Sequence, residues 1–407
     1  MSITNKNFQK QIKIARIFFV ISAIYGLSLR LYKVTSFITI DYKRILQAHS
    51  HVTFLGWGFL AVISIIGIVY YPEKLKKSIY LKSLFYIMAS MLVGMLISFP
   101  IQGYKLFSIV FLSVFLIVSY LYLIEVYKVL KEDKSYDSRF IKIGIFYYFL
   151  SSLAIWMIAI VTVKYGKTTL YYNSVYFYLH FLYNGFFVFT LFGLFIKYLK
   201  QQKIQVGDKQ IKYFYLYTHI ACVPAYTLSL LWANNSLVVN VFSVLSAALQ
   251  LVTLLFLYRI VKSFFKQKKS RQVKWMGILI FGSYFLKIIL QAVTVFPGMI
   301  KITLQLKPYF IVGYLHLFTL GFMSMLIFLL LILLVKVKLS KIGMYIFILG
   351  ILLSEGLLFL QGGLFLIFKN GITNINLLLL FVSSLMPIGL LLIYFNIDFK
   401  QKSKVVV

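Results

Sequence analysis

A chain of 407 residues that is 61% hydrophobic and only 13% charged is too apolar for a soluble globular protein, whose charged share is about 25%. Its mean hydropathy of +0.92 leads to the same conclusion. The formal net charge of +33 would indicate nucleic-acid binding in a soluble protein, but the basic residues here are sorted by loop, as membrane insertion requires. We therefore expect an all-α, polytopic membrane protein that contacts the lipid bilayer and binds no nucleic acid.

Apolar runs of about 18 residues or more are long enough to cross a bilayer. The first run is not followed by a small-residue cleavage site, so we interpret it as a retained span. The spans form one transmembrane domain over residues 1–407, with no separate soluble domain. In chain order, the sequence predicts twelve: 13–30, 45–70, 79–99, 105–127, 141–163, 172–196, 212–232, 237–258, 275–296, 309–335, 342–368 and 374–395.

The loop charges predict the orientation of these spans. Seven basic residues lie between Arg259 and Lys274, after the eighth span, whereas the turn around Asn234 and Asn235 before that span holds none. By the positive-inside rule, even-numbered spans end in the cytoplasm. Both termini are then cytoplasmic, and the expected location is the cytoplasmic (inner) membrane.

Three of the five histidines begin the same short pattern, in which a glycine and an aromatic residue follow five and six positions later. The three segments are His51 with Gly56-Trp57, His180 with Gly185-Phe186, and His316 with Gly321-Phe322. They fall on spans two, six and ten, at one depth in the outer half of the bilayer. This recurrence predicts three pseudo-repeated units of four helices.

Histidine inside a membrane span is costly without a partner, so each of these residues is a candidate functional site; the alternative is a polar contact between helices. His49 precedes His51 by two residues, and their side chains should point about 200° apart on a helix. The two cannot therefore bind one metal from one face. His219 lies in the seventh span before Pro224, which should bend that helix.

Two charged residues lie near the middle of apolar spans. Lys287 is in the ninth span and Glu355 in the eleventh. Each is expensive alone in a bilayer. We expect either a buried ion pair, a lysine that reaches a haem propionate, or a proton relay.

Twelve spans, repetition by four helices and histidines on spans two, six, seven and ten resemble subunit I of the haem-copper oxidase and nitric-oxide reductase superfamily. The resemblance implies that His49 or His51, together with His316, clamps a low-spin haem, and that His180 and His219 bind copper. Whichever of His49 and His51 does not bind haem would join that copper centre. The only cysteine, Cys222, excludes a Cys-x-x-Cys-His attachment, so the haem would be a non-covalent b-type haem.

The chain also departs from that superfamily. Its seventh span has Thr218-His219 where oxidases have two histidines, and its tenth has Tyr314-Leu315-His316, so the axial ligand of a catalytic high-spin haem is missing. After His180, Tyr183 comes at three positions and Asn184 at four, where oxidases have tyrosine. The NnrS proteins, haem-copper membrane proteins linked to nitric-oxide tolerance, are similar too and require fewer ligands.

These features predict a membrane haem protein, with copper as a second candidate cofactor. It would act in electron transfer or in dioxygen or nitric-oxide handling, with an electron-donor protein or quinol as partner, and an oxidoreductase activity stays open. The alternative is a metal-free transporter or membrane scaffold with structural histidines.

Overall fold

The computed structural model describes residues 6–234, 236–396 and 398–399, and the chain is all-α apart from one pair of two-residue strands. The strands, β1 (Val337–Lys338) and β2 (Asp398–Phe399), pair antiparallel. Within the described residues, eleven helices are long and apolar enough to cross a membrane. The expected all-α, polytopic membrane class is therefore confirmed at this level.

The difference between eleven helices and the twelve predicted spans lies at 212–232. There the chain forms a 15-residue α-helix, α10 (Asp208–Cys222), followed by a 3₁₀ segment, η3 (Pro224–Ser229). Pro224 cannot donate a backbone hydrogen bond, and its ring disfavours the preceding α-helical turn. The predicted bend is therefore present as the end of the α-helix.

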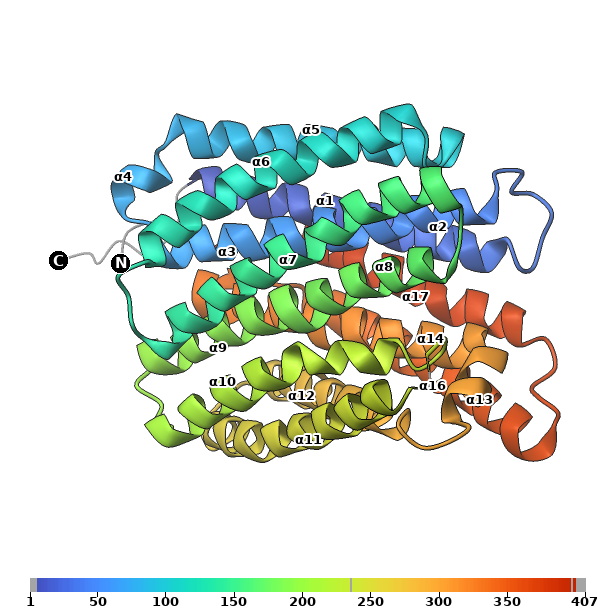
Figure 1. Cartoon of the computed structure of the whole chain (residues 1–407). Helices are drawn as coiled ribbons and strands as arrows, with labels where there is room; N and C mark the ends of the chain where they lie inside the picture. Colours follow the sequence, from blue (N-terminus) through green and yellow to red (C-terminus); the bar gives the residue numbers. More distant parts are fainter. Residues whose placement is uncertain (1–5, 235, 397, 400–407) are drawn as a thin grey trace. The chain divides into compact units, whose positions relative to one another are not determined.

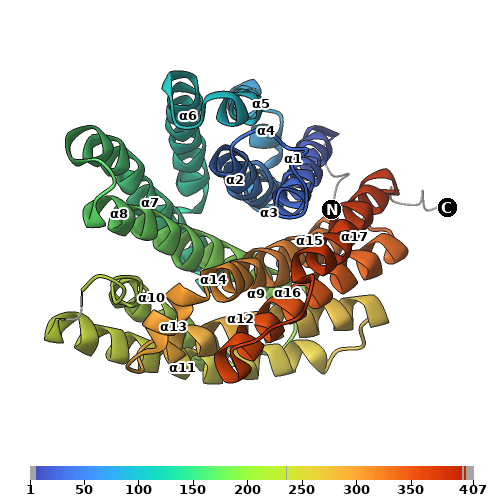
Figure 2. The same ribbon diagram turned by 90° about the vertical axis from the view of Figure 1, so that its right-hand side faces the viewer.

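The chain divides into two compact units. Unit 1 contains residues 1–129 and 327–407. Its helices are α1 (Lys6–Leu31), α2 (Tyr42–His51), the π-helical η1 (Val52–Phe59), α3 (Leu60–Tyr70), α4 (Glu73–Lys76), α5 (Ile79–Gln102), α6 (Leu106–Leu130), the π-helical η5 (Leu331–Val335), α16 (Lys341–Phe368) and α17 (Ile375–Phe395). In the end-on view of Figure 2, α1 lies beside α2 and α3, and α16 lies beside α17.

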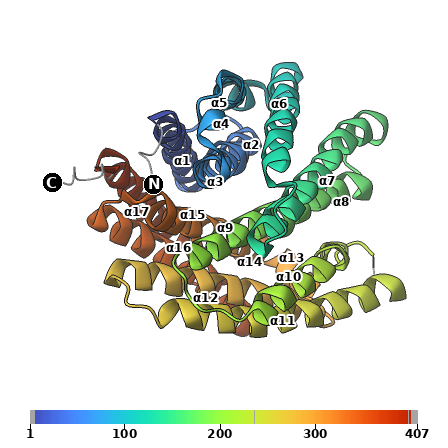
Figure 3. The same cartoon turned by 90° about the vertical axis from the view of Figure 1, so that its left-hand side faces the viewer.

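Unit 2 contains residues 130–326. Besides α10 and η3, its helices are α7 (Tyr136–Tyr165), α8 (Thr169–His180), the π-helical η2 (Phe181–Phe187), α9 (Val188–Gln201), α11 (Leu237–Phe265), α12 (Arg271–Val293), α13 (Met299–Gln305), α14 (Lys307–His316) and the π-helical η4 (Leu317–Ser324). The boundary between the units falls inside α15 (Met325–Leu330). Helices α10 and α11 run side by side (Figures 1 and 3).

The three repeated histidine segments share one backbone conformation. His51, His180 and His316 are each the last residue of an α-helix, and a π-helical stretch begins at the next residue in all three places. π-Helical turns are rare and frequently occur at functional sites. The sequence repeat is thus also a repeat of an unusual local structure.

The glycine of each segment packs against the helix of the preceding predicted span. A Cβ atom on Gly56 would lie 2.9 Å from the Cβ of Phe18, on Gly185 it would overlap with the Cβ of Tyr147, and on Gly321 with the hydroxyl of Ser283. These contacts pair η1 with α1, η2 with α7, and η4 with α12. The glycines let two backbones approach closely, as small residues do in membrane helix pairs.

Unit 1 also brings the first part of α1 beside the end of its last helix. The guanidinium of Arg16 lies 5.5 Å from the centre of the Tyr394 ring, near the end of α17. The first and last helices of the chain are therefore in contact within unit 1.

Candidate functional site: the buried histidines and their partners

His49 is held against α1 in unit 1. Its Nδ1 lies 2.8 Å from the backbone carbonyl oxygen of Ser22, and the missing side chain of Gly26 leaves room for the ring. A carbonyl oxygen only accepts hydrogen bonds, so Nδ1 carries the proton and a neutral ring has its lone pair on Nε2. This tautomer suits a metal ligand that binds through Nε2.

His51 faces a different neighbour. Its Nδ1 lies 2.8 Å from the carbonyl oxygen of Gln47, its Nε2 lies 3.0 Å from the hydroxyl of Tyr104, and its ring stacks on Phe99 of α5 at 4.6 Å between centroids. His49 thus faces α1 and His51 faces α5 and the turn after it. The prediction that these two side chains point to different sides of one helix is confirmed.

In unit 2, His180 is part of a directed chain of hydrogen bonds. Its Nε2 donates to the backbone carbonyl of Cys222 at 2.8 Å, and its Nδ1 accepts from the amide nitrogen of Asn184 at 3.2 Å. The amide oxygen of Asn184 in turn accepts a hydrogen bond from Lys287. Lys287, Asn184, His180 and the Cys222 carbonyl form a hydrogen-bonded series that we call the His180 chain. This series uses both ring nitrogens of His180.

His219 has a partner on α7. The hydroxyl of Tyr147 lies 3.0 Å from His219 Nδ1, and the ring of Tyr215 stacks on the imidazole at 6.0 Å. His180 and His219 therefore each have their own hydrogen-bond partners in unit 2. Within the described residues, no group of three or more His, Cys, Asp or Glu side chains is arranged to hold a metal ion.

His316 lies in unit 2, at the end of α14. The predicted haem pair is His49 or His51 with His316. The predicted three-histidine centre is His180 and His219 with whichever of His49 and His51 does not bind haem. Both remain predictions.

The two charged residues in the spans have different surroundings. Lys287 is buried on α12 and donates to Asn184, a neutral residue. Glu355 is buried on α16, within electrostatic range of Arg30 on α1. The sequence interpretation did not assign roles to Asn184 and Arg30. Asn184 follows His180 by four residues, so helical spacing was a signal that could have paired them.

A small cavity opens beside the His180 chain. It measures about 20 Å³, and its lining includes Asn184, Thr218, Cys222, Tyr284 and Lys287. A water molecule needs roughly 10–15 Å³, so the cavity has room for one small species. Four predicted spans, the sixth to the ninth, contribute to it.

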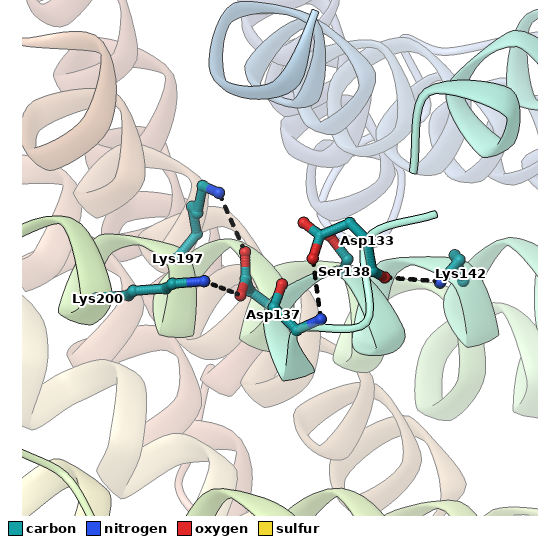
Figure 4. Close-up of polar contacts among 7 residues, drawn as sticks. Asp133, Asp137, Ser138, Lys142, Lys197 and Lys200 are labelled. Atoms are coloured by element: carbon teal, nitrogen blue, oxygen red, sulfur yellow. Dashed lines mark hydrogen bonds and ion pairs between the residues drawn. The ribbon is translucent and has the colours of Figure 1, made fainter. Parts of the chain in front are cut away.

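A separate ionic cluster joins the start of α7 to the end of α9 (Figure 4). The buried carboxylate of Asp137 lies 3.3 Å from the Nζ of Lys197 and 3.8 Å from that of Lys200. Asp133, in the preceding turn, accepts hydrogen bonds from the Ser138 hydroxyl at 2.6 Å and the Ser135 backbone N–H at 2.9 Å. Burial of Asp133 opposes ionisation, but these hydrogen bonds and the charge of Lys197 together hold its pKa at about 2.

Comparisons with models of protein families and with curated protein sequences find no match for this chain.

Proposed function

We propose that this chain is a multi-pass protein of the cytoplasmic membrane, with both termini in the cytoplasm, that binds a b-type haem through histidine side chains. It resembles subunit I of the haem-copper oxidase superfamily and would act in electron transfer or in dioxygen or nitric-oxide handling. The observation that supports the proposal is the hydrogen bond from His49 Nδ1 to the Ser22 carbonyl. Histidine ligands typically donate their second N–H to such a group, which fixes the tautomer and orients the ring.

His49 and His51 both hold Nδ1 at 2.8 Å from a backbone carbonyl oxygen, so each ring could present Nε2 to iron. For His51 to bind iron through Nε2, it would have to give up the contact with the Tyr104 hydroxyl. We propose that His49 and His316 would hold the haem. Haem, when bound, supplies one-electron chemistry, whereas the protein supplies the two imidazoles and the apolar surroundings that exclude water.

Copper fits the geometry less well. If His180 bound a metal, it would lose either the hydrogen bond to the Cys222 carbonyl or the one from Asn184. We therefore propose haem as the cofactor and assign His180 to the hydrogen-bond chain that includes Lys287. Metal analysis of the purified protein tests whether His180 and His219 bind copper.

Pyridine haemochrome spectra and metal analysis of the purified chain, expressed with haem supply, test the proposal. Wild-type protein should show a low-spin Soret band, which His49→Ala and His316→Ala should abolish. His51→Ala and the control His219→Ala should retain it. Wild-type protein without a Soret band would refute haem binding. If His49→Ala kept the band and His51→Ala lost it, the ligand would be His51.

A metal-free transporter is the second candidate, and the His180 chain favours it. Buried polar and ionisable groups inside a bilayer frequently mark a path for an ion or substrate. If wild-type protein contains no haem and no copper, this candidate takes precedence. Ion flux into proteoliposomes that depends on Lys287 would then support it directly.

A further inference from the structure

The cavity beside Lys287 combines a buried cation with an unsatisfied hydroxyl. Lys287 is 2% exposed and Thr218 is 8% exposed, and both line the cavity. The hydroxyl oxygen of Thr218 has no hydrogen-bond partner among the described residues. A buried hydroxyl normally has a partner, so the cavity is where that partner belongs.

When protonated, Lys287 has no acidic partner among the described residues that line the cavity. Its ammonium group has three N–H donors, and Asn184 accepts one of them with a neutral amide oxygen. Among the described residues that line the cavity, none is acidic; Cys222 contributes a thiol and Tyr284 an aromatic ring 5.9 Å from Lys287 Nζ. A charge inside a membrane span needs a counter-charge more than a neutral partner.

We propose that this cavity binds one small monovalent anion of halide size, held between the Lys287 ammonium and the Thr218 hydroxyl. Both groups donate hydrogen bonds, which a halide accepts. The volume of about 20 Å³ is close to what one water molecule needs, so we expect a halide to enter the cavity and the larger sulfate to be excluded. Asn184 then acts as a positioning residue, because its amide oxygen holds the Lys287 amine at the cavity.

The site is independent of the proposed haem. Its residues come from η2, α10 and α12, all in unit 2, and they do not include His49 or His316. Loss of haem binding would leave the anion site intact, and loss of the anion site would leave the haem spectrum of the protein unchanged.

Equilibrium dialysis of the purified full chain against radioactive chloride, with gluconate as the balancing anion, tests the proposal. Wild-type protein should bind one chloride per chain, bromide should displace it and sulfate should not. Lys287→Met should abolish binding. Thr218→Val should weaken it about tenfold, as expected for the loss of one hydrogen bond to a charged group.

Lys301→Met is the matched control, since Lys301 is exposed on α13 of the same unit. It should bind chloride as the wild type does. If wild-type protein binds no chloride, the cavity holds water and the proposal is wrong. Chloride binding that persists in Lys287→Met, or that is unchanged in Thr218→Val, would also overturn it. The Thr218→Val test stands even if Lys287→Met fails to fold.

Discussion

The His51 segment of unit 1 and the His180 segment of unit 2 have the same backbone frame but different polar partners. Each histidine ends an α-helix before a π-helical stretch. The glycine that follows packs on α1 in unit 1 and on α7 in unit 2. Four residues after His51 the chain has Leu55, whereas four residues after His180 it has Asn184, which links the imidazole to Lys287. The comparison indicates that the repeat fixes where a histidine lies and that its neighbours decide what it can do.

The largest expected effect comes from the shared glycine contact. Gly185→Ala should destabilise the protein by about 2–3 kcal/mol, because its new Cβ would meet the Cβ of Tyr147, which cannot move without its backbone. Gly56→Ala should destabilise the protein less, since a Cβ on residue 56 would lie 2.9 Å from the Cβ of Phe18. Thermal unfolding in detergent measures both.

Gly282→Ala is the control for this series, because nothing lies within 4 Å of a Cβ at Gly282 on α12. It should be neutral or slightly stabilising, since alanine favours helix over glycine. A Gly185→Ala protein as stable as Gly282→Ala would show that the packing of η2 on α7 is looser than the structure indicates.

Much of this fold follows from the sequence because span length and apolarity are local properties. Eleven predicted spans coincide with helices to within a few residues at most ends. The largest differences are at the start of α1, which begins at Lys6 and not at 13, at the start of α7, and at the ends of α9 and α11. The exception is 212–232, where Pro224 ends the helix. Hydropathy counts apolar residues and does not detect this loss of one backbone donor.

The polar partners were harder to predict because they come from helices distant in sequence. Opposite directions for His49 and His51 followed from helical geometry and are confirmed. The partners themselves, Ser22 for His49 and Tyr104 for His51, depend on how α1 and α5 pack on α2. The π-helical stretches were not predicted either, since a change in hydrogen-bond register leaves no mark in the apolar pattern.

The second prediction removes the residue that distinguishes the two segments. Asn184→Leu copies the apolar residue of the His51 segment with the same number and branching of heavy atoms, and it should destabilise the protein by about 2 kcal/mol. The reason is that Lys287 and His180 each lose a buried hydrogen-bond partner. Thermal unfolding measures the loss.

Asn396→Leu is the matched control for this substitution. Asn396 is exposed just after the end of α17, and its side-chain amide donates to the Leu392 carbonyl at 3.1 Å. Its replacement should change stability by less than about 0.5 kcal/mol, as is usual for surface positions. If Asn184→Leu changed stability as little as Asn396→Leu, the hydrogen bonds of Asn184 to Lys287 and His180 would not stabilise the protein. The His51 and His180 segments would then differ in sequence alone.

The smallest expected effect concerns the ends of the two helix pairs, where unit 1 is neutral and unit 2 is charged. In unit 1 the buried side chain of Gln11 on α1 accepts a hydrogen bond from Ser64 on α3 at 3.4 Å. In unit 2 the corresponding helices, α7 and α9, are joined by the Asp137–Lys197 ion pair, with Asp133 beside it. Acid should therefore weaken unit 2 through the carboxylate of Asp133.

The third prediction uses Asp133, whose pKa of about 2 in the folded protein is lower than the value of about 3.9 expected when unfolded. Its stabilising contribution is complete above about pH 5 and is lost as the pH falls from about 5 toward 2, because the unfolded chain then binds the proton more readily. Asp133→Asn should flatten the fall in melting temperature over this interval. Above pH 5 it should lower the melting temperature by an amount that does not change with pH. Glu132→Gln, which removes an exposed neighbouring carboxylate, should keep the wild-type slope. A wild-type slope in Asp133→Asn would mean that the acid sensitivity comes from elsewhere in the chain.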